Sequence, residues 1–197
     1  QDAISLNSNL NNWDTSNVTI MNRMFQGALT FNQALNNWDV SDVTNMDSMF
    51  RLATSFNQSL NSWNTGSVSN IDQMFRDAHS FNGDISNWNV SSVTTMSRTF
   101  ESASAFNKPI DSWNIINVTD MSYMFSGAQS FNQALNGWNT SNVTNMLEMF
   151  AYANSFNQAL NNWDVSKVSN TTRMFRSAIS FNSSLSNWNL TGTTSIA

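Results

Sequence analysis

An acidic or amide side chain follows each tryptophan of this sequence, and a regular row of such side chains could bind a metal ion. The column reads Asp14, Asp39, Asn64, Asn89, Asn114, Asn139, Asp164 and Asn189. Regular rows of carboxylates can bind Ca²⁺. Only three of these eight residues are carboxylates, and Asp14 and Asp39 alone come from adjacent repeats. We therefore expect no metal site.

Catalytic chemistry has little support in the residue pattern. The single histidine, His79, falls at a variable position that we expect to be an exposed loop. We find no nucleophile–base pair, glycine-rich phosphate loop or metal-ligand cluster, and without cysteine there is no thiolate site or disulfide. We expect neither an enzyme nor a cofactor.

Charge and hydropathy exclude further classes of function. The net charge is −5 with 11% charged residues, whereas a nucleic-acid-binding protein needs a basic face. No apolar run is long enough to span a bilayer. We expect no nucleic-acid partner and no membrane span.

The tryptophans themselves define a repeat that runs through the chain. They recur every 25 residues, at 13, 38, 63, 88, 113, 138, 163 and 188, and two phenylalanine columns share that period. Such regularity is typical of a stack of similar coils. An exposed tryptophan row would suit sugar stacking. We expect it to be core instead, because Leu35 and Val40 flank Trp38 on the inward side and an exposed row would form a large apolar patch.

Two hydrophobic periods alternate within each unit. The alternation of Trp38 and Val40 with polar residues predicts a short strand. The spacing from Val43 to Ala53, with Thr44 as a cap, predicts a short helix. Parallel strands pack ~4.8 Å apart and helices roughly 8–10 Å apart, so the stack should curve. We predict an α/β repeat solenoid resembling leucine-rich repeats, with eight 25-residue coils, strands on the concave face and helices on the convex face.

The repeat occupies the sequence from end to end. We expect residues 1–197 to form a single repeat domain. The first residues are already in phase, since Leu10 corresponds to Leu35. We expect the chain to be a fragment or processed part of a longer protein.

The repeat resembles a known family. The pattern F-N-Q-x-L-N-x-W-[DN]-[TV]-S-x-V-T-x-M-x-x-M-F, clearest in residues 31–50, 131–150 and 156–175, resembles the BspA-like surface proteins and in particular their mycoplasma-type repeats. This resemblance implies an extracellular protein, at the cell surface or secreted, that acts in adhesion or protein binding. It carries over no catalytic residues and no ligand.

Several columns invite structural explanations. We expect the unbroken asparagine column, from Asn32 to Asn182, to form a buried ladder of amide–backbone hydrogen bonds. Evenly spaced threonines at 19, 44, 94, 119 and 144 would suit ice binding, but we expect them to cap helices. If the source is eukaryotic, the best N-glycosylation acceptors are Asn17, Asn117 and Asn142, in the turn after each strand.

A binding surface is expected on the concave strand face. Its residues are small, rich in amides and hydroxyls, and nearly uncharged: Asn37, Asp39, Ser62, Asn64, Asn87, Asn89, Ser112, Asn114, Asn139, Asn162 and Asp164. We predict a non-enzymatic recognition or adhesion module that binds a host or neighbouring-cell surface protein or glycan through this face. The alternative is a structural spacer or assembly subunit that stacks end to end through its open coil ends.

Overall fold

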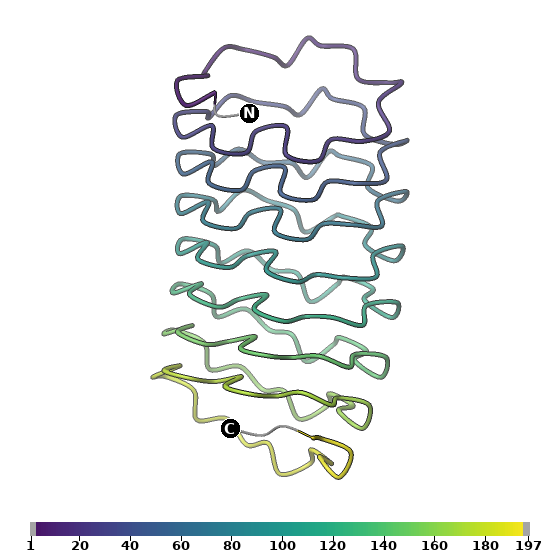
Figure 1. The fold of residues 1–197 in the computed structure, drawn as a ribbon, viewed down its shortest axis with the longest axis vertical. Helices are drawn as coiled ribbons and strands as arrows, with labels where there is room; N and C mark the ends of the chain where they lie inside the picture. Colours follow the sequence, from purple (N-terminus) through teal and green to yellow (C-terminus); the bar gives the residue numbers. More distant parts are fainter. Residues whose placement is uncertain (1–2, 195–197) are drawn as a thin grey trace.

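The computed structural model describes residues 3–194. The chain winds into coils that lie one on the next along the long axis of the molecule, in sequence order (Figure 1). Equivalent residues of adjacent coils are 25 positions apart, so every column in the sequence becomes a row along the stack.

The predicted strands and helices are wrong. Residues 3–194 contain no helix, and the only β-pairing is a series of single-residue parallel bridges. These bridges link Ile20, Asn45, Asn70, Thr95, Asp120, Asn145 and Asn170 in succession. About half of each coil lies in turns and almost all of the rest is irregular; the stretch expected to be a strand has a turn at 36–37 and no assigned structure at 38–40.

Consecutive turns replace the expected helix. We call residues 45–53 and their counterparts in the other coils the Met-Phe segment. Within it, the Met49 N–H donates to the Met46 carbonyl at 3.2 Å, and the Ala53 N–H donates to the Phe50 carbonyl at 3.0 Å. Apolar residues therefore stand at the first and fourth positions of two successive turns. This places them three and four residues apart, the same spacing as one face of a helix.

Two residues of every Met-Phe segment have a positive φ, which no α-helix allows. They stand four residues apart, as Ser48 (φ 56°) and Leu52 (φ 62°) do in the second coil. A left-handed third residue is the feature that defines a type II turn. Glycine occupies the second of these positions at Gly27 and Gly127, where the absence of Cβ removes the steric cost.

Alternate N–H groups of the Met-Phe segment donate to the next coil. The Ser48 N–H donates to the Asp72 carbonyl at 2.8 Å, and the Phe50 N–H to the Met74 carbonyl at 2.9 Å. The N–H groups between them close the turns within the coil. Because this side of the stack is joined by backbone hydrogen bonds, its spacing stays near the ~4.8 Å of paired strands. The expected convex row of helices, and the concave strand face opposite it, are therefore absent; the coils form a column (Figure 1).

Aromatic rows fill the interior, as the sequence predicts. Phe50 and Phe75 of adjacent coils are stacked 5.6 Å apart, and Phe75 lies 3.8 Å from Phe81 within its coil. Trp63 and Trp88 are nearly parallel, 6.2 Å apart and 3–4% exposed. Stacked rings of this kind add to the free energy gained by burying their apolar area.

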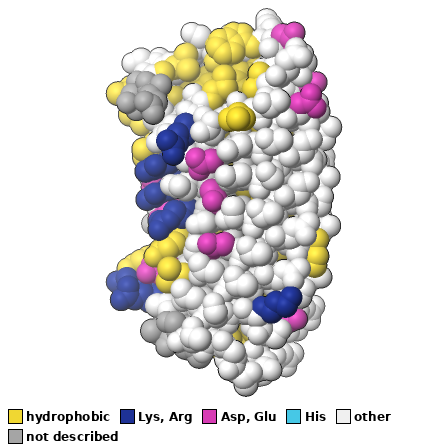
Figure 2. Space-filling model, turned by 45° about the vertical axis from the view of Figure 1, so that its right-hand side comes forward, with side chains coloured by type: hydrophobic (Ala, Val, Ile, Leu, Met, Phe, Trp, Pro, Cys, Tyr) yellow, Lys and Arg dark blue, Asp and Glu magenta, His cyan; other side chains and the backbone are white. Residues whose placement is uncertain are grey.

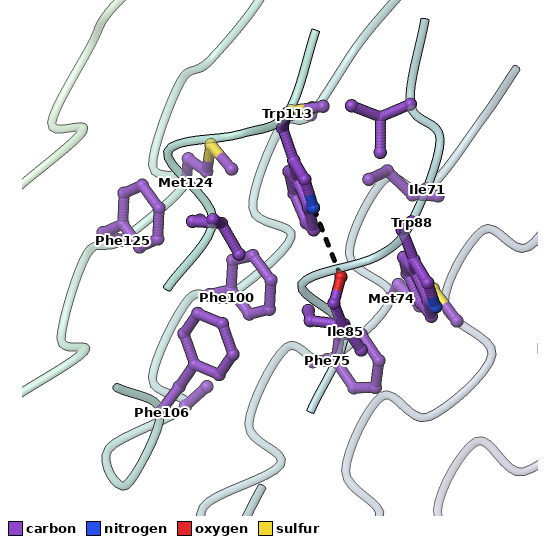
Figure 3. Close-up of a cluster of buried hydrophobic side chains, with 14 of the residues drawn as sticks. Ile71, Met74, Phe75, Ile85, Trp88, Phe100, Phe106, Trp113, Met124 and Phe125 are labelled. Atoms are coloured by element: carbon purple, nitrogen blue, oxygen red, sulfur yellow. Dashed lines mark hydrogen bonds between the residues drawn. The ribbon is translucent and has the colours of Figure 1, made fainter. Parts of the chain in front are cut away.

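Each buried indole also ties two coils together. The Trp113 Nε1–H donates to the Ile85 carbonyl of the preceding coil at 3.3 Å (Figure 3). The same bond recurs from Trp38 to Trp188, with distances of 2.8 to 3.3 Å. A buried indole N–H needs such a partner, so the tryptophan row serves packing and hydrogen bonding together.

The asparagine ladder forms as expected, although it is not buried. The Asn107 Oδ1 accepts the backbone N–H of Asn132 in the next coil at 3.0 Å. The same bond joins successive asparagines from Asn7 to Asn182. These side chains are exposed or half-buried, so the expectation of a buried loop is wrong.

Candidate functional site

The residues predicted to bind a partner lie together as rows on one side of the stack. All eleven are exposed, and they flank the buried tryptophans on both sides in the sequence. We call these eleven residues the polar face. The residues before each tryptophan lie in turns and those after it in irregular backbone, so none of them is part of a strand.

The residue after tryptophan is fixed by its own turn. The Asp39 Oδ1 accepts the Ser41 N–H at 2.9 Å, and the Asn89 Oδ1 accepts the Ser91 N–H at 3.1 Å. All eight coils have this bond. Such a side-chain turn orients the carboxylate or amide before any partner arrives.

The amide nitrogens of this row remain available. Among the described residues, Nδ2 of Asn64, Asn89, Asn114 and Asn139 donates no hydrogen bond to protein. Each Nδ2 carries two N–H donors. Four consecutive coils therefore present pre-oriented donors along one exposed row.

The row before tryptophan is more closely tied to the stack. The Ser62 hydroxyl donates to the Asn36 carbonyl at 2.9 Å, and the Ser112 hydroxyl to the Ser86 carbonyl at 3.2 Å. Gly137 interrupts the row; a Cβ there would lie 2.9 Å from the Asp111 carboxylate. This row supplies fewer free groups than the row after tryptophan.

Sequence reasoning missed a second amide ladder two residues before tryptophan. The Asn61 Oδ1 accepts the Asn87 N–H at 2.7 Å, and the Asn136 Oδ1 accepts the Asn162 N–H at 3.0 Å. Asp111 replaces asparagine in the same role toward Gly137. The recurrence of Asn, Asp or Ser at this position was the available signal. This ladder holds the backbone of the polar face.

Hydrogen bonds favour the ionised form of the carboxylates on the polar face. Hydrogen bonds from the Ser41 hydroxyl and N–H lower the pKa of Asp39, and those from Ser166 lower the pKa of Asp164. Within residues 3–194, no group of three or more His, Asp or Glu side chains is placed to hold a metal ion.

The other columns singled out in the sequence have varied surroundings. Asn17 and Asn117 are exposed, and Asn142 is half-buried. The Asn117 and Asn142 Nδ2 groups donate to carbonyls of the preceding coil at 2.8 and 2.9 Å, whereas the Asn17 Nδ2 donates to the adjacent Ser16 hydroxyl at 3.4 Å. The Thr44 hydroxyl donates to the Thr19 carbonyl at 3.3 Å. With no helix to cap, the threonines join adjacent coils instead.

The arginine columns lie on the Met-Phe segments, where ion pairs connect neighbouring coils. Arg76 lies 2.9 Å from Glu101, and Arg98 stands over the Tyr123 ring at 4.0 Å. Figure 2 shows basic side chains gathered along one edge with acidic side chains beside them, next to a broad face with little charge. Because Arg23, Arg76, Arg98 and Arg173 all lie in ion pairs with carboxylates of the same surface, we assign these columns no partner. His79 is exposed, and its Nδ1 lies 2.9 Å from the Ser102 carbonyl.

The repeat matches a known protein family. The family described as Mycoplasma protein of unknown function, DUF285, matches residues 1–113 and 94–197. The chain belongs to the DUF285 family. Membership of DUF285 confirms the mycoplasma-type repeat indicated by the sequence pattern. No curated protein matches the chain.

Among residues 3–194 there is no helix that is long and apolar enough to cross a membrane.

Proposed function

We propose that this DUF285 repeat chain is a non-enzymatic recognition module of the cell surface that binds an extended protein segment or a glycan through the polar face. The single observation that supports this most strongly is the row of exposed, pre-oriented amide nitrogens at Asn64, Asn89, Asn114 and Asn139. Pre-orientation reduces the entropy lost when a ligand binds.

The spacing of the row suits an elongated ligand. Adjacent tryptophan rings beside this row are 6.2–6.5 Å apart, so four amides span roughly 19 Å, about the length of five or six extended residues. Carbonyl and hydroxyl oxygens of a peptide or sugar chain would accept the amide N–H groups. With little net charge in the row, binding should depend weakly on ionic strength.

The resemblance to BspA-like surface proteins supports an extracellular location, at the cell surface or secreted. The ligand would then be a host or neighbouring-cell surface protein or glycan. No cofactor is required for this role.

A conservative double variant tests the proposal. Asn89→Asp with Asn139→Asp keeps the oxygen that closes each turn but removes the free amide donors; Asp39 and Asp164 already occupy this row. After a glycan and host-protein array has provided a ligand, the double variant should bind it at least tenfold more weakly, with an unchanged melting temperature. Binding equal to that of the parent chain would refute the proposal.

A structural role, as a spacer or assembly subunit that stacks end to end with further repeats, is the second candidate. The uniform contacts between coils favour it, since each internal coil presents the same rings and backbone groups to the next. Light scattering that showed only monomers at high concentration would count against this role.

A further inference from the structure

Asn136 and Gly137 are the two central residues of the turn that precedes Trp138. The Trp138 N–H donates to the Leu135 carbonyl at 3.1 Å and closes this turn. Asparagine followed by glycine is prone to an internal reaction, in which the glycine backbone nitrogen attacks the carbon of the asparagine amide. All the reacting atoms belong to one dipeptide, so the attack needs no second molecule. Glycine leaves the nitrogen open, because it has no Cβ.

A carboxylate holds the proton that this attack must remove. The Asp111 Oδ1 accepts the Gly137 N–H at 2.9 Å. The acceptor in the equivalent contact of another coil is an amide oxygen, as Asn61 is for the Asn87 N–H. An amide oxygen is a very weak base, whereas a carboxylate within hydrogen-bond reach of the proton has the geometry of a general base. Asp111 is the only carboxylate at its position in the repeat.

The lack of a side chain at Gly137 allows this carboxylate to come close. A Cβ at Gly137 would lie 2.9 Å from the Asp111 Oδ2 and 3.0 Å from the Oδ1. Any other residue would therefore displace the carboxylate. Gly137 is also the only glycine that directly precedes a tryptophan. The base and the open backbone nitrogen thus occur together at one place in the repeat.

The amide of Asn136 is arranged for the same reaction. Its Oδ1 accepts the Asn162 N–H at 3.0 Å. A backbone N–H in this place stabilises the negative charge that develops on the oxygen as the nitrogen adds. The Asn136 Nδ2, which would be the leaving group, donates no hydrogen bond to protein within residues 3–194. Gly137 is exposed, so water can reach the product.

We propose that Asn136 is a self-modification site, where Asp111 is the general base that converts the asparagine to aspartate and isoaspartate. Asp111 takes the proton from the Gly137 nitrogen as this nitrogen forms a bond to the Asn136 Cγ. The bond from Cγ to Nδ2 then breaks, and Asp111 passes the proton to the departing nitrogen, which leaves as ammonia. Water adds to one of the two ring carbonyl carbons of the resulting succinimide. The ring opens to aspartate or isoaspartate, and the Asp111 carboxylate is regenerated.

The two products affect the stack differently. Aspartate keeps an oxygen acceptor for the Asn162 N–H, as Asp111 does for the Gly137 N–H. Isoaspartate adds a methylene group to the backbone and so shifts the turn relative to the ladder. Both products add a negative charge close in sequence to Asn139 of the polar face. The inference does not depend on the function proposed for that face.

Incubation of the 197-residue chain at neutral pH, followed by peptide mapping with mass spectrometry, measures the reaction. Asn82-Gly83, the other Asn-Gly pair of the sequence, is the internal comparison, because the Gly83 N–H donates no hydrogen bond within the described residues. In the folded chain Asn136 should convert roughly tenfold faster than Asn82. In urea, which removes the contact with Asp111, the two rates should become nearly equal. Equal rates in the folded chain, or faster conversion of Asn82, would overturn the proposal.

The variant Asp111→Asn isolates the base. The amide keeps an oxygen acceptor for the Gly137 N–H, so conversion of Asn136 should slow by about tenfold while the rate at Asn82 stays the same. A variant that merely loosened the turn would convert faster, because a freer backbone reaches the ring geometry more readily. Conversion of Asn136 at the parent rate or above would therefore overturn the proposal.

The matched control is Asp164→Asn, which removes a carboxylate of the same surface that does not contact Gly137. This control should leave the conversion of Asn136 unchanged. Hydroxylamine, which cleaves a chain at a succinimide, should cut the parent chain after Asn136 and cut the Asp111→Asn variant much less. An equal slowing by Asp164→Asn and Asp111→Asn would show a general effect of charge and would overturn the role of Asp111.

Discussion

Removal of one amide from the asparagine ladder tests how the stack is held together. The Asn107 Oδ1 accepts two hydrogen bonds, from the Asn132 N–H at 3.0 Å and from the Gln133 Nε2 at 2.9 Å. Asn107→Ala deletes both acceptors, and the half-buried Asn132 N–H loses its partner. An unpaired backbone donor costs about 1–3 kcal/mol. The loss of the Gln133 bond adds little, since water can replace it.

The expected result is a lower melting temperature. A loss of about 1–3 kcal/mol corresponds to roughly 2–10 °C for a chain of this size. Thermal and urea unfolding followed by tryptophan fluorescence would measure it. The matched control is Asn107→Asp, which keeps the oxygen acceptor and should lie much closer to the parent chain at neutral pH. The reasoning is refuted if both variants lose equal stability, or if the alanine variant melts with the parent.

Two further substitutions probe burial and close packing. Burial raises the pKa of Asp72, so the ionised carboxyl destabilises the folded state above that pKa. Asp72→Asn should therefore raise the melting temperature at pH 7. The expected gain is only about 1–3 °C, because Asp72 is partly in contact with solvent. Its advantage should shrink as pH falls toward ~4, and an advantage constant across a pH series of melts would contradict this. A Cβ at Gly83 would lie 2.1 Å from the Gln58 carbonyl oxygen, so Gly83→Ala should cost about 1–3 kcal/mol in urea unfolding. Gly66→Ala, whose Cβ meets nothing closer than 3.4 Å, is the control; equal midpoints for the two variants would refute the steric argument.

The aromatic rows were predictable because the apolar character of a side chain and its repeat spacing together determine whether it is buried. Trp63, flanked by Leu60 and Val68 in the same phase, had to lie inside whatever the backbone did. The predicted helix failed because hydrophobic spacing does not distinguish a helix from successive turns. Met46, Met49, Phe50 and Ala53 fit both. Gly27 and Gly127, at the second left-handed position, were the available signal for turns.

The polar face was predictable in position but not in hydrogen bonding. Alternation around Trp88 indicated that Asn87 and Asn89 point outward, and both are exposed. Which atoms remain free depends on the turn. The Asn89 Oδ1 is committed to the Ser91 N–H, while the Ser62 hydroxyl is committed to the Asn36 carbonyl. The first of these bonds is made within one coil and the second to a residue 26 positions earlier, in the adjacent coil. Composition alone does not reveal either bond.

The hydrogen bonds from each indole N–H to the preceding coil restrict how genes for such repeats can change in length. The Trp88 Nε1 reaches the Leu60 carbonyl, 28 positions earlier, and the recurring backbone and amide-ladder bonds between coils have fixed offsets of 24 to 26 positions. Gain or loss of a whole 25-residue unit keeps each offset and returns every side chain to its row. An insertion of a single residue displaces one tryptophan from its carbonyl and one phenylalanine from its stack. Length variation in these proteins should therefore occur in complete units, with the number of coils free to vary and the length of a coil fixed.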